Sequence, residues 1–227
     1  MTRQVAHRAE AEVRIPVGAA ALTGNLDVPA HARGIVLFAH GSGSSRHSPR
    51  NVWVAGELQR AGIATLLFDL LTSAEEARDI HTREHRFDIP LLATRLVDAT
   101  HWIDAQPPLR PLSVGYFGAS TGSAAALVAA AELGERVDAV VSRGGRPDLA
   151  GASALPRVSA ATLLIVGGDD EVVLDLNRSA YAQMSCERRL AVVPGATHLF
   201  EEPGTLEQVA ALAVEWFAAH LRARSAG

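Results

Sequence analysis

The chain has 227 residues, of which 48% are apolar and 20% are charged, enough to bury the core of one α/β domain. Its net charge of −4 offers no basic field for nucleic acid or an anionic membrane, so the expected partner is a small molecule. All 21 basic residues are arginine, which excludes Schiff-base catalysis, a Walker lysine and lysine-bound pyridoxal phosphate. We expect no cofactor.

The N-terminal residues are polar and lack the apolar core of a signal peptide, and no apolar run approaches the roughly 18 residues of a membrane span. These features predict a soluble, cytoplasmic protein. We expect one domain over 1–227, with flexible ends at 1–10 and 222–227. The single cysteine, Cys186, permits no internal disulfide and no cysteine-based zinc cluster, so we interpret it as a structural or incidental thiol.

The first elements are two short strands at 11–16 and 20–29, which we expect to pair as an antiparallel entry hairpin. Gly34–Ala39 is a continuous apolar run, typical of a central strand that is buried on both faces. The loop after it ends at Ser48-Pro49, where serine as the N-cap and proline in the first turn predict the start of a helix.

The next buried strand, at 64–69, is followed by a charged segment, 72–88, which we expect to be a polar flap or a solvated connection. A helix with apolar residues on one face then ends before Pro107, and a Thr205-x-x-Gln208 capping box predicts the start of a final helix. Four more strands are expected, at 112–117, 137–142, 161–166 and 189–193. This alternation predicts an α/β fold with a mostly parallel central sheet and helices on both faces, where ligands bind beyond the carboxyl ends of the strands.

The stretch Gly118-Ala-Ser120-Thr-Gly122 lies between an apolar run of strand composition and a small-residue run that favours a helix. This order is typical of a nucleophile elbow, whose sharp turn leaves no room for bulk at Gly118 or Gly122. Ser120 is therefore the candidate nucleophile. The N–H of Thr121, at the start of the following helix, is a candidate oxyanion donor.

A serine hydroxyl is a weak nucleophile that needs a base and an acid behind the base. The loop after the strand at 161–166 carries Asp169, Asp170 and Glu171, and the loop after the last strand carries His198. The order serine, acid, histidine along the chain is the one that the nucleophile-elbow fold uses. We therefore expect His198 to be the base and one of the three acids to orient it.

Three motifs carry a resemblance to a known family. They are Gly118-x-Ser120-x-Gly122, Gly167-Gly-x-Asp170-x-x-Val173 and Gly195-x-x-His198. By these residues the chain resembles the α/β-hydrolase superfamily and, within it, the small dienelactone hydrolase family, over nearly its whole length.

The resemblance implies an α/β-hydrolase fold and a triad whose acid is the aspartate before x-x-Val, hence Asp170 and not Asp169. Dienelactone hydrolases proper carry cysteine in the elbow, whereas this chain carries Ser120. A serine there points to hydrolysis of carboxylic esters or lactones through an acyl-enzyme.

The loop His40-Gly-Ser42-Gly43 resembles the oxyanion loops of such enzymes, and we expect the Ser42 N–H, with Gly43 next in order, to be the second oxyanion donor. A phosphate cradle is the alternative for this loop, but the third glycine of the dinucleotide fingerprint is missing.

Arg143 and Arg146 follow the strand at 137–142 at the functional edge of the sheet. A guanidinium fork fits a substrate carboxylate in a bidentate manner, so both residues are candidates for substrate binding. The alternative is a structural ion pair with Asp148 or Asp170.

Two other functions stay open. His81-Thr-Arg-Glu84-His85 matches the H-x-x-E-H zinc motif, so one alternative is a zinc-dependent hydrolase. The other is a non-catalytic binding protein with an α/β-hydrolase fold. On any of these readings the segment 143–160 is too short for a cap domain, which predicts an open, shallow pocket for short to medium acyl groups.

Overall fold

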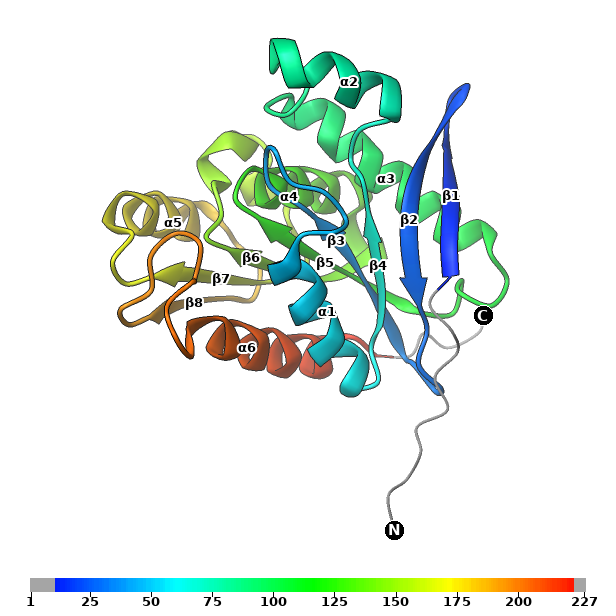
Figure 1. Cartoon of the computed structure of the whole chain (residues 1–227). Coiled ribbons are helices and arrows are strands. Elements are labelled where there is room, and N and C mark those ends of the chain that lie inside the picture. The colour runs from blue at the N-terminus through cyan, green and yellow to red at the C-terminus, as the bar shows by residue number, and fades with distance from the viewer. Residues whose placement is uncertain (1–10, 223–227) are drawn as a thin grey trace.

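Within residues 11–222, eight strands form one sheet in the order β1-β2-β4-β3-β5-β6-β7-β8 (Figure 1). The structure is a computed structural model that describes residues 11–222, so of the ends expected to be flexible only Arg222 lies inside the described range. The strands are β1 (Ala11–Val17), β2 (Ala20–Asp27), β3 (Gly34–Ala39), β4 (Ala64–Phe68), β5 (Ser113–Ala119), β6 (Val137–Arg143), β7 (Ala161–Gly167) and β8 (Arg188–Val193). The helices are α1 (Pro49–Arg60), α2 (Ser73–Thr82), α3 (Ile89–Ala105), α4 (Thr121–Leu133), α5 (Glu171–Gln183) and α6 (Thr205–His220).

The sheet is antiparallel only at its entry. β1 pairs with β2 and β2 with β4 in antiparallel fashion, whereas every pairing from β4 through β8 is parallel. The predicted entry hairpin and mostly parallel sheet are therefore confirmed. Because parallel strands run in one direction, the loops that follow β3, β5, β6, β7 and β8 meet at one edge of the sheet.

Helices cover both faces of the sheet. Apolar residues of α1 and α6 pack on one face, and those of α3, α4 and α5 pack on the other (Figure 1). Every residue of β3, β5 and β7 is buried, as expected of strands that are covered on both sides. In α4, the run 123–127 is fully buried and consists of small side chains except for Leu127, which lets this helix lie close to β5.

The turn between β5 and α4 brings backbone segments into direct contact. A Cβ added to Gly118 would lie 2.4 Å from Ser123 Cα, and one added to Gly122 would lie 2.2 Å from the carbonyl oxygen of Ala39 and 2.5 Å from that of His40. The expectation that both elbow glycines exclude a side chain is thus confirmed, and the reason is close approach of backbone atoms that cannot move aside.

One of the two predicted helix starts is confirmed as drawn. Ser48 is the N-cap of α1 and Pro49 lies in its first turn, although the Ser48 side chain makes no capping hydrogen bond. The predicted Thr205-x-x-Gln208 box is wrong, because Gly204, in the left-handed conformation, is the N-cap of α6. Thr205 is buried, and its hydroxyl donates instead to the carbonyl of Glu202 at 2.7 Å. A hydrogen bond to the residue three positions earlier thus takes the place of the predicted capping box.

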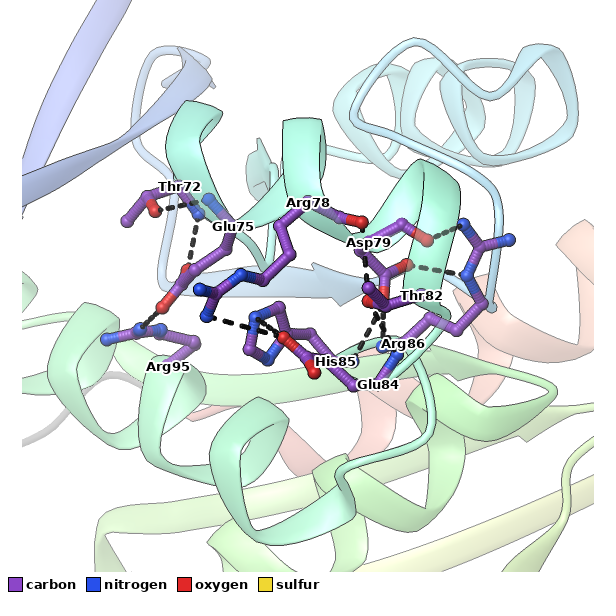
Figure 2. A network of polar contacts seen from close by, with 9 residues as sticks. All are labelled: Thr72, Glu75, Arg78, Asp79, Thr82, Glu84, His85, Arg86 and Arg95. Atoms are coloured by element: carbon purple, nitrogen blue, oxygen red, sulfur yellow. Dashed lines mark hydrogen bonds and ion pairs between the residues drawn. The ribbon is translucent and has the colours of Figure 1, made fainter.

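The segment 72–88, expected to be a polar flap or a solvated connection, contains a helix that the sequence analysis did not predict. It contains α2, which begins at a capping box: Thr72 Oγ1 accepts from the Glu75 N–H, and a Glu75 carboxylate oxygen accepts from the Thr72 N–H (Figure 2). The pattern Thr-x-x-Glu was present in the sequence and the sequence analysis passed over it. The other Glu75 oxygen accepts from Arg95 of α3 at 2.6 Å, which ties α2 to the body of the protein.

Asp79 anchors the far end of α2 (Figure 2). Its carboxylate is 1% exposed and accepts hydrogen bonds from the N–H groups of His85 and Arg86 at 2.7 and 3.1 Å and from Arg86 Nε at 2.5 Å. Burial by itself would raise the pKa of the Asp79 carboxyl, but these hydrogen bonds outweigh burial and hold the pKa below its ordinary value. The carboxylate stays charged and folds the chain back after the helix.

The segment 144–160 between β6 and β7 contains only two short 3₁₀ helices, Pro147–Ala150 and Leu155–Arg157, so no cap domain is inserted there. Within residues 11–222, no helix has both the length and the apolar character needed to cross a membrane.

We predict that Asp79→Asn lowers the free energy of unfolding by about 3 kcal/mol at pH 7, because Arg86 then loses its buried partner. Since the native pKa of Asp79 is lowered, this stabilisation is complete above the unfolded pKa of about 3.9 and is lost as the pH falls through the native value. Urea unfolding of both proteins at pH 7 and at progressively lower pH measures the effect. The control is Glu76→Gln on the exposed face of α2. Equal stabilities at pH 7 would contradict the anchoring role.

We predict that Gly122→Ala destabilises the fold by about 3 kcal/mol or more, because the new methyl group would overlap two backbone carbonyls. The matched control is Gly56→Ala in α1, where the added Cβ meets only the end of the Arg60 side chain at 4.0 Å. That change should stabilise the protein by about 0.5–1 kcal/mol, because alanine is the better helix former. Thermal unfolding of the two variants checks the pair, and a Gly122→Ala protein as stable as wild type would refute the close-approach explanation.

Candidate active site

Three side chains from three loops meet beyond the carboxyl ends of β5, β7 and β8. His198 Nε2 lies 3.4 Å from Ser120 Oγ, and His198 Nδ1 lies 2.7 Å from a carboxylate oxygen of Asp170. The other two candidate acids point elsewhere: Asp169 and Glu171 are exposed and have no hydrogen bond to His198. The structure thus brings together the serine, the histidine and Asp170.

Ser120 has a strained backbone, with φ 49° and ψ −120°, which is rare for a residue with a side chain. Its carbonyl oxygen accepts three hydrogen bonds that hold this conformation, from the N–H groups of Ser123 and Arg146, both at 3.1 Å, and from Ser123 Oγ at 2.8 Å. The sequence analysis missed this role of Ser123, which carries no motif signal of its own. The anchored turn projects the Ser120 hydroxyl toward His198.

The loop that carries His198 is held by Glu202, another residue that the sequence analysis missed. The Glu202 carboxylate accepts from the N–H and the hydroxyl of Thr197, at 3.1 and 2.6 Å. The hydrogen bond from the Thr197 side chain is the main reason why the pKa of Glu202 lies below its ordinary value. The glutamate therefore remains charged and fixes the residue before His198.

The two residues predicted to supply the oxyanion donors lie side by side and are joined by a hydrogen bond. The Ser42 N–H donates to Thr121 Oγ1 at 2.9 Å, so this donor is occupied by a side chain that the motif did not implicate. Thr121 itself is the first residue of α4, where helical N–H groups lack intrahelical partners. The oxyanion roles of Ser42 and Thr121 remain predictions.

His40, at the start of this loop, is buried and structural. Its Nδ1–H donates to the Gly41 carbonyl at 3.0 Å, and its Nε2 accepts from the Leu70 N–H at 3.1 Å. Burial lowers the pKa of His40, which matches the neutral tautomer that these two hydrogen bonds require. Both ring nitrogens are in use, so His40 is no rival to His198 as a base.

The two arginines after β6 have different surroundings. Arg146 forms a two-pronged ion pair with Asp148, at 2.8 and 2.7 Å, as the structural alternative predicted for it. Arg143 contacts neither Asp148 nor Asp170; its side chain is buried, and its Nε and Nη1 atoms have no hydrogen-bond partner. The guanidinium carbon lies 5.9 Å from the centre of the Phe200 ring.

Ser120 and His198 line a cavity of about 250 Å³ together with Arg143, Ser42 and residues at the start of α1. A larger cavity, of about 370 Å³, lies between the Arg46–Asp69 ion pair and α2. It contains none of the three residues that meet at the sheet edge, so the smaller cavity is the candidate active site.

The zinc motif is not assembled. α2 ends at Thr82, and Arg83 takes the left-handed conformation, so Glu84 and His85 leave the helix that carries His81. Within residues 11–222, no three His, Cys, Asp or Glu side chains are grouped so that they could hold a metal ion. The interpretation of His81, Glu84 and His85 as a metal site is therefore wrong, because the required helix is interrupted.

Cys186 is half-buried beside Thr162, and burial raises the pKa of its thiol, as suits an incidental cysteine.

Comparison with known proteins identifies relatives along most of the chain. No family model matches it. Two curated proteins of Mycobacterium tuberculosis, both named "Putative phosphoribosyl transferase", are 62% identical over 210 residues, which is 92% of this chain. The chain spans only 46% of their length, so it corresponds to about half of each relative.

Solved structures match more completely. A dienelactone hydrolase from Anabaena variabilis superposes with a TM-score of 0.93 and 61% sequence identity, over 94% of this chain and 99% of that one. The Pyrococcus furiosus esterase Pf2001 superposes with a TM-score of 0.78 at 16% identity, over 94% and 93% of the two chains, which supports the fold alone. The sheet order, the nucleophile elbow and the match to the Anabaena variabilis protein agree. The chain therefore belongs to the dienelactone hydrolase-like family of α/β-hydrolases.

Proposed function

We propose that the chain is a serine hydrolase that cleaves carboxylic esters or lactones of short to medium acyl length through an acyl-enzyme on Ser120. The observation that carries this proposal is the continuous contact from Ser120 Oγ to His198 Nε2, at 3.4 Å, and from His198 Nδ1 to Asp170, at 2.7 Å. The family to which the chain belongs supports hydrolase chemistry.

In this mechanism the Nδ1–H of His198 donates to Asp170, which leaves the lone pair of the imidazole on Nε2, facing Ser120. Nε2 takes the hydroxyl proton as Ser120 Oγ attacks the ester carbonyl, and the carboxylate of Asp170 stabilises the imidazolium. The proton then passes to the alcohol oxygen as the C–O bond breaks. A water molecule, deprotonated by the same Nε2, releases the acid and restores the serine.

The negative charge that develops on the carbonyl oxygen needs donors. The Thr121 N–H lies at the positive end of α4 and is the first donor in our proposal. The Ser42 N–H, the second donor, is bonded to the neutral Thr121 hydroxyl. An oxyanion competes well for it, because a hydrogen bond to a charged acceptor is about twice as strong as one to a neutral acceptor.

We predict that Ser120→Ala and His198→Ala each lower kcat by about 10³-fold or more, and that combining them costs little further, because the residues act as one unit. Asp170→Asn should lower kcat to a similar degree by favouring the wrong imidazole tautomer. The matched control is Asp169→Asn, an exposed neighbour that should stay within about 3-fold of wild type.

Labelling with a fluorophosphonate and mass mapping of the modified peptide test the nucleophile directly. Wild type should be labelled on Ser120, and Ser120→Ala should not be labelled. Ester hydrolysis that persists without label on Ser120 would overturn the proposal. Absence of both label and hydrolysis would favour a non-catalytic binding protein.

The shape of the cavity supports a preference for small acyl groups. The cavity beside Ser120 has a volume of about 250 Å³, and the short segment 144–160 supplies no cap to extend it. A longer acyl chain would leave the cavity and bury little additional surface, so it would not gain the roughly 0.8 kcal/mol that each buried methylene group contributes.

We predict that kcat/KM for p-nitrophenyl esters is highest for short acyl chains and falls beyond medium length, without a jump in rate when the substrate forms micelles. Initial rates across a series of acyl lengths, on both sides of the critical micelle concentration, provide the measurement. Rates that keep rising to long-chain esters would contradict the capless pocket.

A further inference from the structure

The hydroxyl of Thr121 lies where the oxyanion of the proposed reaction has to be. The Ser42 N–H donates to Thr121 Oγ1 at 2.9 Å. A backbone N–H has one hydrogen and one favourable direction, so an oxyanion that accepts from it must lie along that direction, about 2.7–3.1 Å from the nitrogen. Two oxygen atoms cannot occupy this point together. While the hydrogen bond to Thr121 exists, Ser42 has no donor for a substrate.

The other expected donor is available in the same structure. Thr121 is the first residue of α4, where a helical N–H has no intrahelical partner, and no acceptor of residues 11–222 is hydrogen-bonded to its N–H. The positive end of the helix favours a negative charge beside this group. The two donors therefore differ: the Thr121 N–H is open to an oxyanion, and the Thr121 side chain closes the Ser42 N–H.

The turn that contains Ser42 is held in place. The Gly41 carbonyl accepts from the Ser44 N–H at 3.2 Å, which closes a tight turn over Ser42 and Gly43. Gly43 has a φ of 69°, a conformation that glycine adopts without strain. A Cβ added to Gly41 would lie 3.3 Å from the Ala119 carbonyl oxygen, so the turn rests against the elbow. We therefore expect the side chain at the start of α4, and not this turn, to move.

Rotation of the Thr121 side chain breaks a single contact. Among residues 11–222, Thr121 Oγ1 is hydrogen-bonded to the Ser42 N–H and to no other group. Threonine in a helix divides between two χ1 rotamers, and a rotation that brings the small Cβ–H to the place of Oγ1 empties the oxyanion position. Its cost is one hydrogen bond between neutral groups, which corresponds to a factor of about 2 to 10 in a rate constant.

We propose that Thr121 limits the rate of ester cleavage through this contact: its hydroxyl plugs the oxyanion hole of the resting enzyme and withdraws only as the substrate carbonyl gains negative charge. The inference rests on the proposed function, because it concerns the oxyanion hole of the same site. A neutral ester oxygen has no advantage over the hydroxyl as an acceptor, whereas an oxyanion forms a hydrogen bond about twice as strong. The Ser42 N–H thus acts in the transition state alone, and removing the plug changes kcat and not KM.

Two substitutions isolate the hydroxyl. Thr121→Ser removes the methyl group, and Thr121→Ala removes the methyl group and the hydroxyl, so the two variants differ in the hydroxyl alone. We expect kcat for p-nitrophenyl acetate to be about 2- to 10-fold higher in Thr121→Ala than in Thr121→Ser, the factor of one neutral hydrogen bond. KM should differ by less than about 2-fold. Formation and hydrolysis of the acyl-enzyme both pass through an oxyanion, so kcat reports the effect whichever step is slower.

Thr205→Ala is the matched control. Thr205 is the first residue of α6 and, like Thr121, is 4% exposed, but its hydroxyl donates to the Glu202 carbonyl. This variant loses a buried hydroxyl at the same helix position without opening a donor at the site, so its kcat should not exceed that of wild type. A kcat that rises as much in Thr205→Ala as in Thr121→Ala would overturn the inference, because the gain would then come from a loosened fold.

A charged inhibitor tests the same contact without turnover. When butylboronic acid binds, a bond forms between Ser120 Oγ and boron, and the hydroxyl proton passes to His198 Nε2, which leaves a negatively charged tetrahedral boronate. Its Ki should be about 2- to 10-fold lower for Thr121→Ala than for Thr121→Ser. A crystal structure of the wild-type adduct should place a boronate oxygen on the Ser42 N–H, with Thr121 Oγ1 rotated away.

Equal kcat and Ki in Thr121→Ala and Thr121→Ser would overturn the plug. A lower kcat in Thr121→Ala would overturn it too, because the hydroxyl would then hold the Ser42 N–H in the orientation that catalysis needs. Both results leave a wild-type enzyme that cleaves esters and is labelled on Ser120. If wild type cleaves no ester and Ser120 stays unlabelled, the proposed function itself fails, and the inference fails with it.

Discussion

The close approach of the elbow backbone to the end of β3 is the constraint on which the rest of the site depends. Gly122 lies against the carbonyls of Ala39 and His40, so the loop that leaves β3 has one place relative to the start of α4. The contact between Ser42 and Thr121 follows from it. A single contact between backbone atoms thus fixes the position of the nucleophile relative to the expected oxyanion donors. The strained φ of Ser120 is retained because the hydrogen bonds and packing around the turn hold that conformation.

The sequence predicts the parts of the fold that depend on local patterns. Apolar runs predict the buried strands, and the spacing of Gly118 and Gly122 predicts the elbow. Both signals lie within a few adjacent residues, so the sequence displays them directly. Helix caps show the limit. Thr72-x-x-Glu75 and Thr205-x-x-Gln208 fit the same motif, yet only the first forms, because the hydroxyl of Thr205 bonds to Glu202 instead. Both candidate partners of the Thr205 hydroxyl are local, and the turn at Gly204 decides between them, so the capping motif alone does not predict the outcome.

The two arginines after β6 show the same limit in the site. Arg146 finds Asp148 two residues further along the chain, a partner that the sequence displays. Whether Arg143 meets an acid depends on what α1 and the loop after β8 place beside it, and these segments are distant in the sequence. They bring Arg50 and Phe200 and no free carboxylate. The contrast between a paired and an unpaired arginine, three residues apart, exists only in three dimensions.

Retaining Arg143 as an unpaired buried charge works against stability, since an apolar side chain of similar volume would remove the desolvation penalty. Natural sequences keep such local conflicts chiefly at functional sites, where the rest of the fold compensates. In this protein other contacts offset the free-energy cost of the buried charge. Strands β5 and β7 are buried throughout, and hydrogen bonds of Asp79 and Glu75 hold α2 in place. The cavity that contains Ser120 therefore also holds a buried arginine that forms no ion pair with any acid of residues 11–222.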